Sequence, residues 1–276
     1  MKKISISCNS GILALLFVMC LLVVSCSLPF ASTPYAENPI AGEETLTQVS
    51  TIDALMAGLY DGVISSGQLK GYGDFGIGTF EALDGEMVIL EGRIYQVKAD
   101  GVASIVNDSL GVPFAAVTFF DSDREVNIAS GTDYAGFQAI LDQNIISDNI
   151  FVAVKLNGNF SYVKTRSVPG QVKPYPLLAD VTQKQSVFEF NNVSGTIVGF
   201  RCPPYVNGVN VPGYHLHFLT NDRKAGGHLL NFTVNEVSTS VDYTSEFLMI
   251  LPEESSDFYK LDLSQDKKEE LEKVEK

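Results

Sequence analysis

The pattern of hydrophobic and polar positions changes near the middle of the chain. In the first half, apolar residues recur at helical spacing from Leu46 to Val63, which predicts an amphipathic helix ending near Gly62. Residues 133–141 show the same period and predict a second helix. Shorter apolar runs between these two helices predict strands at residues 87–90, 93–98 and 115–120. A Glu91-Gly92 turn joins the first two of these strands.

From Ile150 onward the pattern is typical of β-strands. Two apolar runs flank Asn157-Gly158-Asn159, which predicts a hairpin turn. Further strands are expected at residues 186–190, 193–201, 213–219, 227–234 and 241–250. The last segment, Pro252 to Lys276, is charged, but the apolar residues spaced through it indicate that it lies across the folded body. We therefore expect an α+β fold that is mostly β, with mixed or antiparallel sheets and a few helices.

All three histidines of the chain lie close together in the sequence, at His215, His217 and His228. Side chains alternate faces along a strand, so His215 and His217 point the same way. Turn-forming residues then lead to a second apolar run, which begins next to His228. Catalytic zinc sites have three protein ligands and leave a fourth position open. A hairpin that carries three neutral imidazoles and no fourth protein ligand therefore predicts such a site.

The first 25 residues have the pattern of a secretory signal. Lys2 and Lys3 precede an unbroken apolar run from Ile12 to Val24, which is too short for a membrane-spanning helix. Val23-Val24-Ser25-Cys26 resembles a bacterial lipobox, in which Cys26 becomes the lipidated first residue of the mature protein. We therefore expect an exported protein, either anchored to the membrane through Cys26 or released, with residues 26–44 as a tether.

The hydrophobic content, the net charge and the cysteines limit which folds and functions fit the chain. The chain has 276 residues, of which 45% are hydrophobic, enough for one large or two small cores. Its formal net charge of −14 argues against nucleic-acid binding, which requires a basic surface. If Cys26 is lipidated, Cys202 has no partner for a disulfide and is simplest to interpret as a core residue.

Several segments, taken in order, resemble the alpha-acetolactate decarboxylase family. Single pieces such as Leu83-Asp84-Gly85-Glu86 are common, but the ordered set is specific and runs from about residue 45 to the C-terminus. The matching segments are Gly73-Asp74-Phe75-Gly76-Ile77-Gly78-Thr79-Phe80, Leu83 to Glu86, Tyr95-Gln96, Pro113-Phe114, Thr118-Phe119-Phe120, Thr165-Arg166, Lys173-Pro174-Tyr175-Pro176, Gly195 to Phe200, Gly213 to Phe218 and Ala225 to His228.

This resemblance implies a zinc enzyme that converts 2-acetolactate to acetoin and carbon dioxide. His215, His217 and His228 match the family's zinc ligands. By the same resemblance, Glu86 is an active-site glutamate, Arg166 an active-site arginine, and Thr79 a residue near the substrate. Zinc would act as a Lewis acid, Arg166 would orient the departing carboxylate, and a buried carboxyl group would protonate the product.

The family also uses a glutamate from its C-terminal tail. The candidates here are Glu269, Glu270, Glu272 and Glu275, of which Glu275 fits best. The resemblance further implies a homodimer of two-domain chains. We expect an N-terminal α/β domain at residues 45–180, a C-terminal β domain carrying the metal site at 181–251, and a tail covering the active site at 252–276.

Two other functions compete with this interpretation. A cupin-type metal oxygenase also places His-x-His on a strand, but it would normally have a glutamate three or four residues beyond the second histidine, where this chain has Thr220 and Asn221. A non-catalytic surface lipoprotein that captures zinc is compatible with export and with the acidic composition. Oxygen dependence and turnover of acetolactate distinguish the three.

Overall fold

The structure, a computed structural model, describes residues 41–275. The expected signal, the lipobox at Cys26 and residues 26–40 of the tether lie outside the described residues. No helix within residues 41–275 is long and apolar enough to cross a membrane. The expected domain boundaries stay a prediction.

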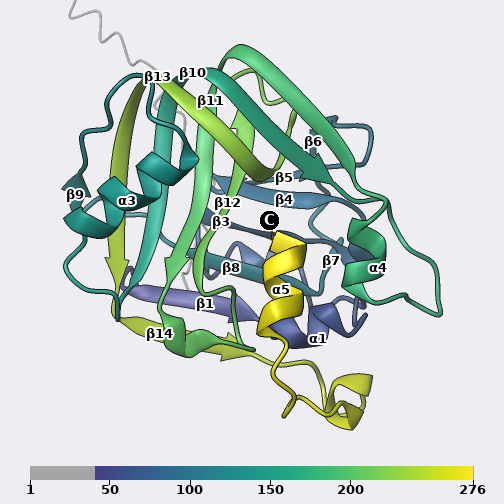
Figure 1. The fold of residues 1–276 in the computed structure, drawn as a ribbon. Coiled ribbons are helices and arrows are strands. Elements are labelled where there is room, and N and C mark those ends of the chain that lie inside the picture. The colour runs from purple at the N-terminus through teal and green to yellow at the C-terminus, as the bar shows by residue number, and fades with distance from the viewer. Residues whose placement is uncertain (1–40, 276) are drawn as a thin grey trace, which may run out of the picture. The chain divides into compact units, whose positions relative to one another are not determined.

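A seven-stranded sheet forms one half of the described fold (Figure 1). Its strand β14 pairs in parallel with β1, and the other neighbours are antiparallel. In spatial order the strands are β14 (Glu246–Ile250), β1 (Thr45–Val49), β8 (Phe114–Thr118), β3 (Phe75–Thr79), β4 (Glu86–Leu90), β5 (Arg93–Val97) and β6 (Ala103–Ile105).

The second sheet is antiparallel and closes on itself. Its order is β10-β11-β12-β13-β9, and an additional pairing joins β10 to β13, so four strands form a ring with no free edge between them. The strands are β10 (Phe151–Ser167), β11 (Ser186–Cys202), β12 (Gly213–Thr220), β13 (Gly226–Thr244) and β9 (Arg124–Glu125). A separate two-stranded sheet joins β2 (Ile64–Ser65) and β7 (Gly111–Val112).

Short helices complete the described residues. The α-helices are α1 (Ile52–Met56), α2 (Ser66–Leu69), α3 (Tyr134–Asn144), α4 (Leu178–Thr182) and α5 (Lys268–Glu275), and the 3-10 helices are η1 (Glu81–Leu83), η2 (Pro204–Val206) and η3 (Asp257–Lys260). The mostly β, α+β architecture is therefore confirmed.

Buried side chains divide into clusters that follow this arrangement. One cluster lies between the two large sheets and includes Phe75, Val88 and Phe200. Another is formed by the ring of strands with α3, which contributes Phe137 and Leu141. A third gathers the helices α1, α4 and α5. These contacts fix both sheets and the C-terminal helix around the place where the two sheets meet.

The predicted helix over residues 46–63 is wrong. Residues 45–49 instead form β1, which lies between β14 and β8 and has all five residues buried. Pairing on both sides satisfies its backbone groups and overrides the helical period of its apolar residues. Only Ile52–Met56 is helical, capped by the Thr51 side chain, which accepts a hydrogen bond from Ala54 N.

The predicted hairpin turn at Asn157-Gly158-Asn159 is also wrong. β10 continues through these residues and pairs with β11 on one side and β13 on the other. A Cβ at Gly158 would lie 2.2 Å from the carbonyl oxygen of Glu236, so this glycine permits a close approach of two strands rather than a turn. Likewise, the strands expected at 186–190 and 193–201 form the single strand β11.

The C-terminal boundaries of the β-rich half also differ from the prediction. β13 runs without a break from Gly226 to Thr244, and β14 belongs to the other sheet. The predicted helix at 133–141, the Glu91-Gly92 turn and the strand at 213–219 are confirmed as α3, the β4–β5 connection and β12.

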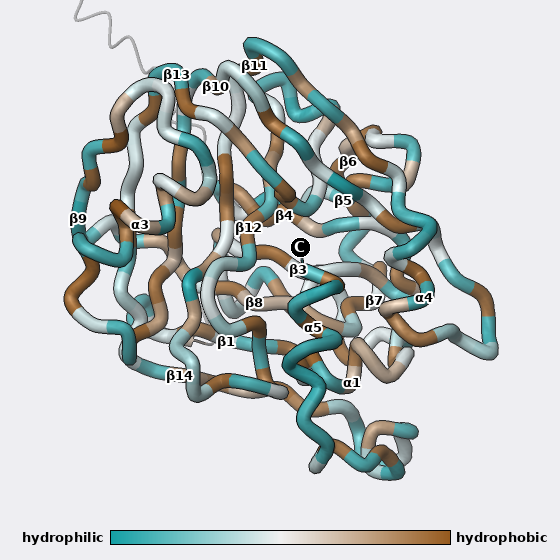
Figure 2. The backbone as a smooth tube through the Cα atoms, in the orientation of Figure 1, coloured by the Kyte–Doolittle hydropathy of each residue, from teal (hydrophilic) through white to brown (hydrophobic). Residues whose placement is uncertain are grey.

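The charged C-terminal segment returns to the body of the fold, as expected. Figure 2 shows α5 as hydrophilic along most of its length, yet Leu271 and Val274 are buried in the cluster shared with α1 and α4. Two apolar side chains on one face therefore anchor this charged helix to the body of the fold.

Candidate active site and metal centre

Alternation along β12 places two of the imidazoles on one face. Leu216 and Phe218 point into the core of the strand ring, so His215 and His217 point out of it toward the seven-stranded sheet. β13 supplies the third imidazole, because His228 pairs directly with His217 in the ladder. Gly227 precedes His228, and a Cβ there would lie 2.4 Å from the Arg166 carbonyl oxygen. The glycine thus lets β13 approach β10 closely enough to position His228.

The three imidazoles converge. Their ring centroids are 5.2 Å apart for His215 and His217, 5.0 Å for His215 and His228, and 5.3 Å for His217 and His228. One nitrogen of each ring lies within 4.8 Å of the other two, and all three side chains are buried. The sequence prediction that these residues form one cluster is therefore confirmed.

The environment keeps these imidazoles neutral. Burial lowers the pKa of His215 to about 3 and lowers the pKa of His217 and His228 well below the ordinary value, and the Arg166 charge adds to each shift. His217 Nδ1 lies 2.7 Å from the carbonyl oxygen of Met87, so it donates there and leaves Nε2 with a free lone pair. A neutral ring held by such a bond is the form that ligates a metal.

A buried ion pair that joins the two sheets lies beside the histidines, with Arg166 on β10 and Glu86 on β4. Arg166 Nη1 lies 3.1 Å from Glu86 Oε1, and Glu86 Oε2 lies 3.7 Å from His217 Nε2. Burial raises the pKa of Glu86 to about 7, although Arg166 opposes the shift and Glu275 adds to it. Glu86 can therefore hold a proton near neutral pH.

Ladder pairing explains why these residues meet. Arg166 pairs with His228 between β10 and β13. On the other sheet, Thr79 pairs with Glu86 between β3 and β4, and its hydroxyl donates to the Gly85 carbonyl oxygen at 2.7 Å. Thr79 thus holds the turn that precedes Glu86, and it also lines the cavity beside the histidines.

The C-terminal helix brings one glutamate into the same place. Glu275 Oε2 lies 3.5 Å from His215 Nε2 and 3.7 Å from His228 Nε2, while Arg166 Nη2 donates to the Val274 carbonyl oxygen at 3.2 Å. Burial raises the pKa of Glu275 to about 7, opposed by Arg166. Of the four tail glutamates considered, the described structure brings Glu275 to the histidines, whereas Glu269 is exposed.

The cavity enclosed by these residues has a volume of about 30 Å³. Its remaining wall is apolar and was not identified from the sequence, which gave no functional signal beyond an apolar pattern. These wall residues are Ile52, Leu55, Leu83, Phe114, Val168 and Leu178. The Met87 carbonyl that orients His217 was also missed, since a backbone group leaves no mark in a sequence.

Comparison with known proteins gives one consistent family. The family described as Alpha-acetolactate decarboxylase matches residues 46–265. A protein of that name from Methanosarcina mazei is 55% identical over 84% of this chain and 81% of its own length, and one from Methylococcus capsulatus is 43% identical over 86% and 92%.

A solved structure agrees with the sequence relatives. The X-ray structure of alpha-acetolactate decarboxylase from Bacillus subtilis superposes with a TM-score of 0.81 at 35% identity, covering 84% of this chain and 98% of the other. A match over most of the chain in both sequence and fold establishes the relationship. The chain belongs to the alpha-acetolactate decarboxylase family, a family of carboxy-lyases.

Proposed function

We propose that the protein converts 2-acetolactate to acetoin and carbon dioxide, using a zinc ion held by His215, His217 and His228. Family membership supports the reaction. The observation that carries the proposal is the meeting of three buried neutral imidazoles with Glu86, Arg166 and Glu275, which come from both sheets and from the C-terminal helix.

The donor set fits a divalent metal. Among residues 41–275, His217 Nε2 and Glu275 Oε2 are buried atoms without a hydrogen-bond partner, and an uncompensated buried polar atom is costly. Three imidazoles with an open position are the donor set of catalytic zinc sites. A zinc ion bound there would supply a Lewis acid for the carbonyl and hydroxyl oxygens of the substrate.

Arg166 is suited to bind the carboxylate that leaves. Its Nε is buried and finds no hydrogen-bond partner among the described residues, while Nη1 and Nη2 are engaged by Glu86 and Val274. A guanidinium held in a fixed orientation binds a carboxylate directionally. When the bond from C2 to the carboxylate carbon breaks, its electron pair stays on C2 and delocalises toward the neighbouring carbonyl group.

A carboxyl group must then deliver a proton to C2. Glu86 and Glu275 both have a pKa of about 7, so either can carry that proton near neutral pH. Both side chains are nearly shielded from solvent, with 8% and 11% of their surface exposed. Delivery from a fixed carboxyl group, rather than from bulk water, would give acetoin of one handedness.

We also propose that the mature protein is exported, carries a lipid on Cys26 or is released, and forms a homodimer. The support is the charged start, the apolar run and the Val23-Val24-Ser25-Cys26 motif, together with the resemblance to the family for the dimer. Mass spectrometry of the mature N-terminus and light scattering of the purified protein test these points.

The experiment that tests the proposed function is an anaerobic assay. Metal-loaded protein is mixed with 2-acetolactate in the absence of oxygen, and acetoin and carbon dioxide are measured beside a chelated sample. We expect equal amounts of both products, and from the chelated sample only the amounts formed without protein. A strict requirement for oxygen would favour a cupin-type oxygenase, and absence of turnover would favour a zinc-capturing protein.

A further inference from the structure

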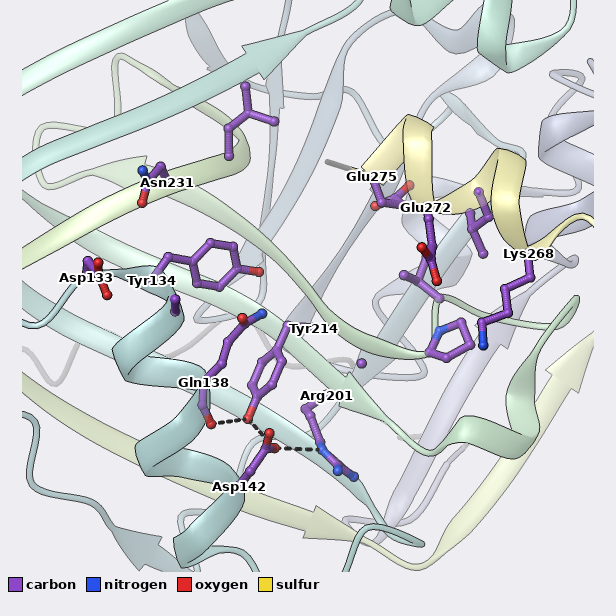
Figure 3. A pocket seen from close by; sticks show the side chains of 16 residues that line it. Asp133, Tyr134, Gln138, Asp142, Arg201, Tyr214, Asn231, Lys268, Glu272 and Glu275 are labelled. Atoms are coloured by element: carbon purple, nitrogen blue, oxygen red, sulfur yellow. Dashed lines mark hydrogen bonds and ion pairs between the residues drawn. The ribbon is translucent and has the colours of Figure 1, made fainter.

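A second and much larger chamber adjoins the histidine site. It has a volume of about 630 Å³, within the ~300–1,000 Å³ of ordinary small-molecule sites. Figure 3 shows it between α3, which carries Tyr134 and Gln138, and α5, which carries Glu272 and Glu275. We call this space the outer chamber, and the cavity of about 30 Å³ beside the histidines the inner cavity.

Glu275 separates the two spaces. It lines both the outer chamber and the inner cavity, and no other described residue lines both. The inner cavity holds about two waters and is too small for an acid of the size of 2-acetolactate. Its apolar wall, which includes Ile52, Phe114 and Leu178, is at least 95% buried, whereas Glu275 also faces the outer chamber.

The strands that carry the histidines also form the wall of the outer chamber. β12 and β13 pair only from His217 to Leu219 on one side and from Gly226 to His228 on the other, and they diverge beyond these residues. Leu230 is an extra residue in β13, since Leu229 pairs with Thr165 and Asn231 with Lys164. Such a bulge re-aims side chains, and it places Leu230 in the chamber wall.

The chamber wall combines apolar surface with neutral polar groups and with the charged side chains of Asp133, Asp142, Arg201, Lys268, Glu272 and Glu275. Leu230, Val211 and the Tyr134 ring give apolar contact, and Gln138 and Asn231 give hydrogen-bonding groups. Burial, aided by the nearby Glu275, raises the pKa of the Tyr134 hydroxyl above its ordinary value, so the hydroxyl remains a donor. The wall thus offers apolar contact for alkyl groups and hydrogen-bonding groups for the oxygens of a small hydroxy acid.

We propose that the outer chamber is the size-selecting part of the substrate site: a 2-hydroxy-3-oxo acid enters through it past Glu275, and its C2 alkyl group packs against the wall near Ala135 and Leu230. The proposal rests on the proposed function, and it adds the route and the residues that determine which acids are accepted. The chamber wall then determines how large an accepted acid can be, whereas the histidines do not.

Two exposed alanines on α3 provide a matched test. Ala135 lines the outer chamber and Ala139, one turn later, does not. Ala135→Trp fills part of the chamber, and Ala139→Trp makes the same change outside it. For each metal-loaded protein, kcat/KM is measured with 2-acetolactate and with the homologue that has ethyl in place of methyl on C2. Calorimetry measures the Kd of 2,3-dihydroxy-2-methylbutanoate, which has no ketone group to take up the electron pair and is therefore not decarboxylated.

We expect Ala135→Trp to lower kcat/KM for 2-acetolactate about tenfold, to lower it about tenfold more for the ethyl homologue, and to weaken binding of the dihydroxy acid by about tenfold. Ala139→Trp should match the parent. If Ala135→Trp does not fold, Ala135→Leu takes its place with smaller changes in the same direction. Equal constants for the Ala135 and Ala139 variants would overturn the chamber's role alone, whereas no turnover by the parent would overturn the proposed function as well.

Discussion

Arg166 donates from Nη2 to the backbone carbonyl oxygen of Val274 at 3.2 Å. The same guanidinium contacts Glu86 through Nη1, so one side chain of β10 joins the buried carboxylate of the other sheet to the last turn of α5. The C-terminal helix is thus contacted by the residue that we expect to bind the leaving carboxylate, and we expect the position of the helix and turnover to depend on each other.

Replacing Arg166 with lysine should loosen the tail while leaving a positive charge in place. An ammonium group cannot reproduce the planar fork that reaches both Glu86 and Val274. We expect faster amide hydrogen exchange in residues 268–275 and at least a tenfold lower kcat, because buried charge-assisted hydrogen bonds contribute about 1.5–3 kcal/mol each. Arg124→Lys, at an exposed arginine of β9, is the control. Unchanged exchange in α5 would contradict the coupling.

The Glu86 carboxyl group should be required for turnover but not for metal binding. Glu86→Gln keeps the shape of the side chain and removes the acid, so we expect kcat to fall by about 10²- to 10⁴-fold with the bound metal retained. Steady-state kinetics and elemental analysis measure the two quantities. Glu91→Gln, in the exposed β4–β5 turn, should behave like the parent. A Glu86→Gln variant with parental kcat would remove Glu86 from the mechanism.

The tail should be needed for activity and not for folding. Truncation after Leu263 removes α5, and the body keeps its two sheets and their shared core. We expect turnover to collapse while the far-ultraviolet circular dichroism spectrum stays that of a folded β protein. Glu275→Gln should reproduce most of this loss, by about 10²-fold, and Glu269→Gln on the same helix should not. Parental turnover by the truncated protein would show that Glu275 takes no part in the reaction.

Asp242 should make folding stability depend on pH. Burial raises its pKa from 3.8 to about 7, and the neighbouring Asp123, Glu44 and Asp121 carboxylates add to the shift, although the Asp121 amide opposes it. Because the pKa of Asp242 is higher in the folded state than in the unfolded state, protonation of Asp242 stabilises the fold. This stabilisation is fully present below about pH 4 and is lost as the pH rises through 7.

Asp242→Asn removes this proton equilibrium. Relative to the parent in the same metal state, the variant should gain stability between pH 5 and pH 8, by at most about 1.4 kcal/mol per pH unit. Urea unfolding at the two pH values measures the difference, with Asp100→Asn at an exposed turn as the control. A difference between variant and parent that is the same at both pH values would show that Asp242 does not titrate in this range.

The histidine cluster could be predicted from the sequence because it is local. His215 and His217 share a face by strand alternation, and a short connection brings back His228. The Glu86–Arg166 pair could not be derived in this way, because the two residues are 80 positions apart and belong to different sheets. Only the resemblance to a family identified them, and only the structure gives their distance.

The errors in the predicted fold also have physical causes. Leu46 and Val49 fit a helical period, but pairing on both sides of β1 decides their structure. Asn157-Gly158-Asn159 has the composition of a turn, yet Gly158 is needed for close contact between strands. In both places, tertiary pairing outweighs a local preference that a single sequence shows.

We expect decarboxylation to require a metal ion held by the three imidazoles. The most direct test measures metal content and carbon dioxide release from 2-acetolactate for the parent and for His217→Ala, with a chelated and zinc-restored parent as the control. We expect one metal ion per parent chain, little metal in the variant, and release of carbon dioxide by the variant at the rate seen without protein. A His217→Ala protein that releases carbon dioxide at the parental rate would contradict it.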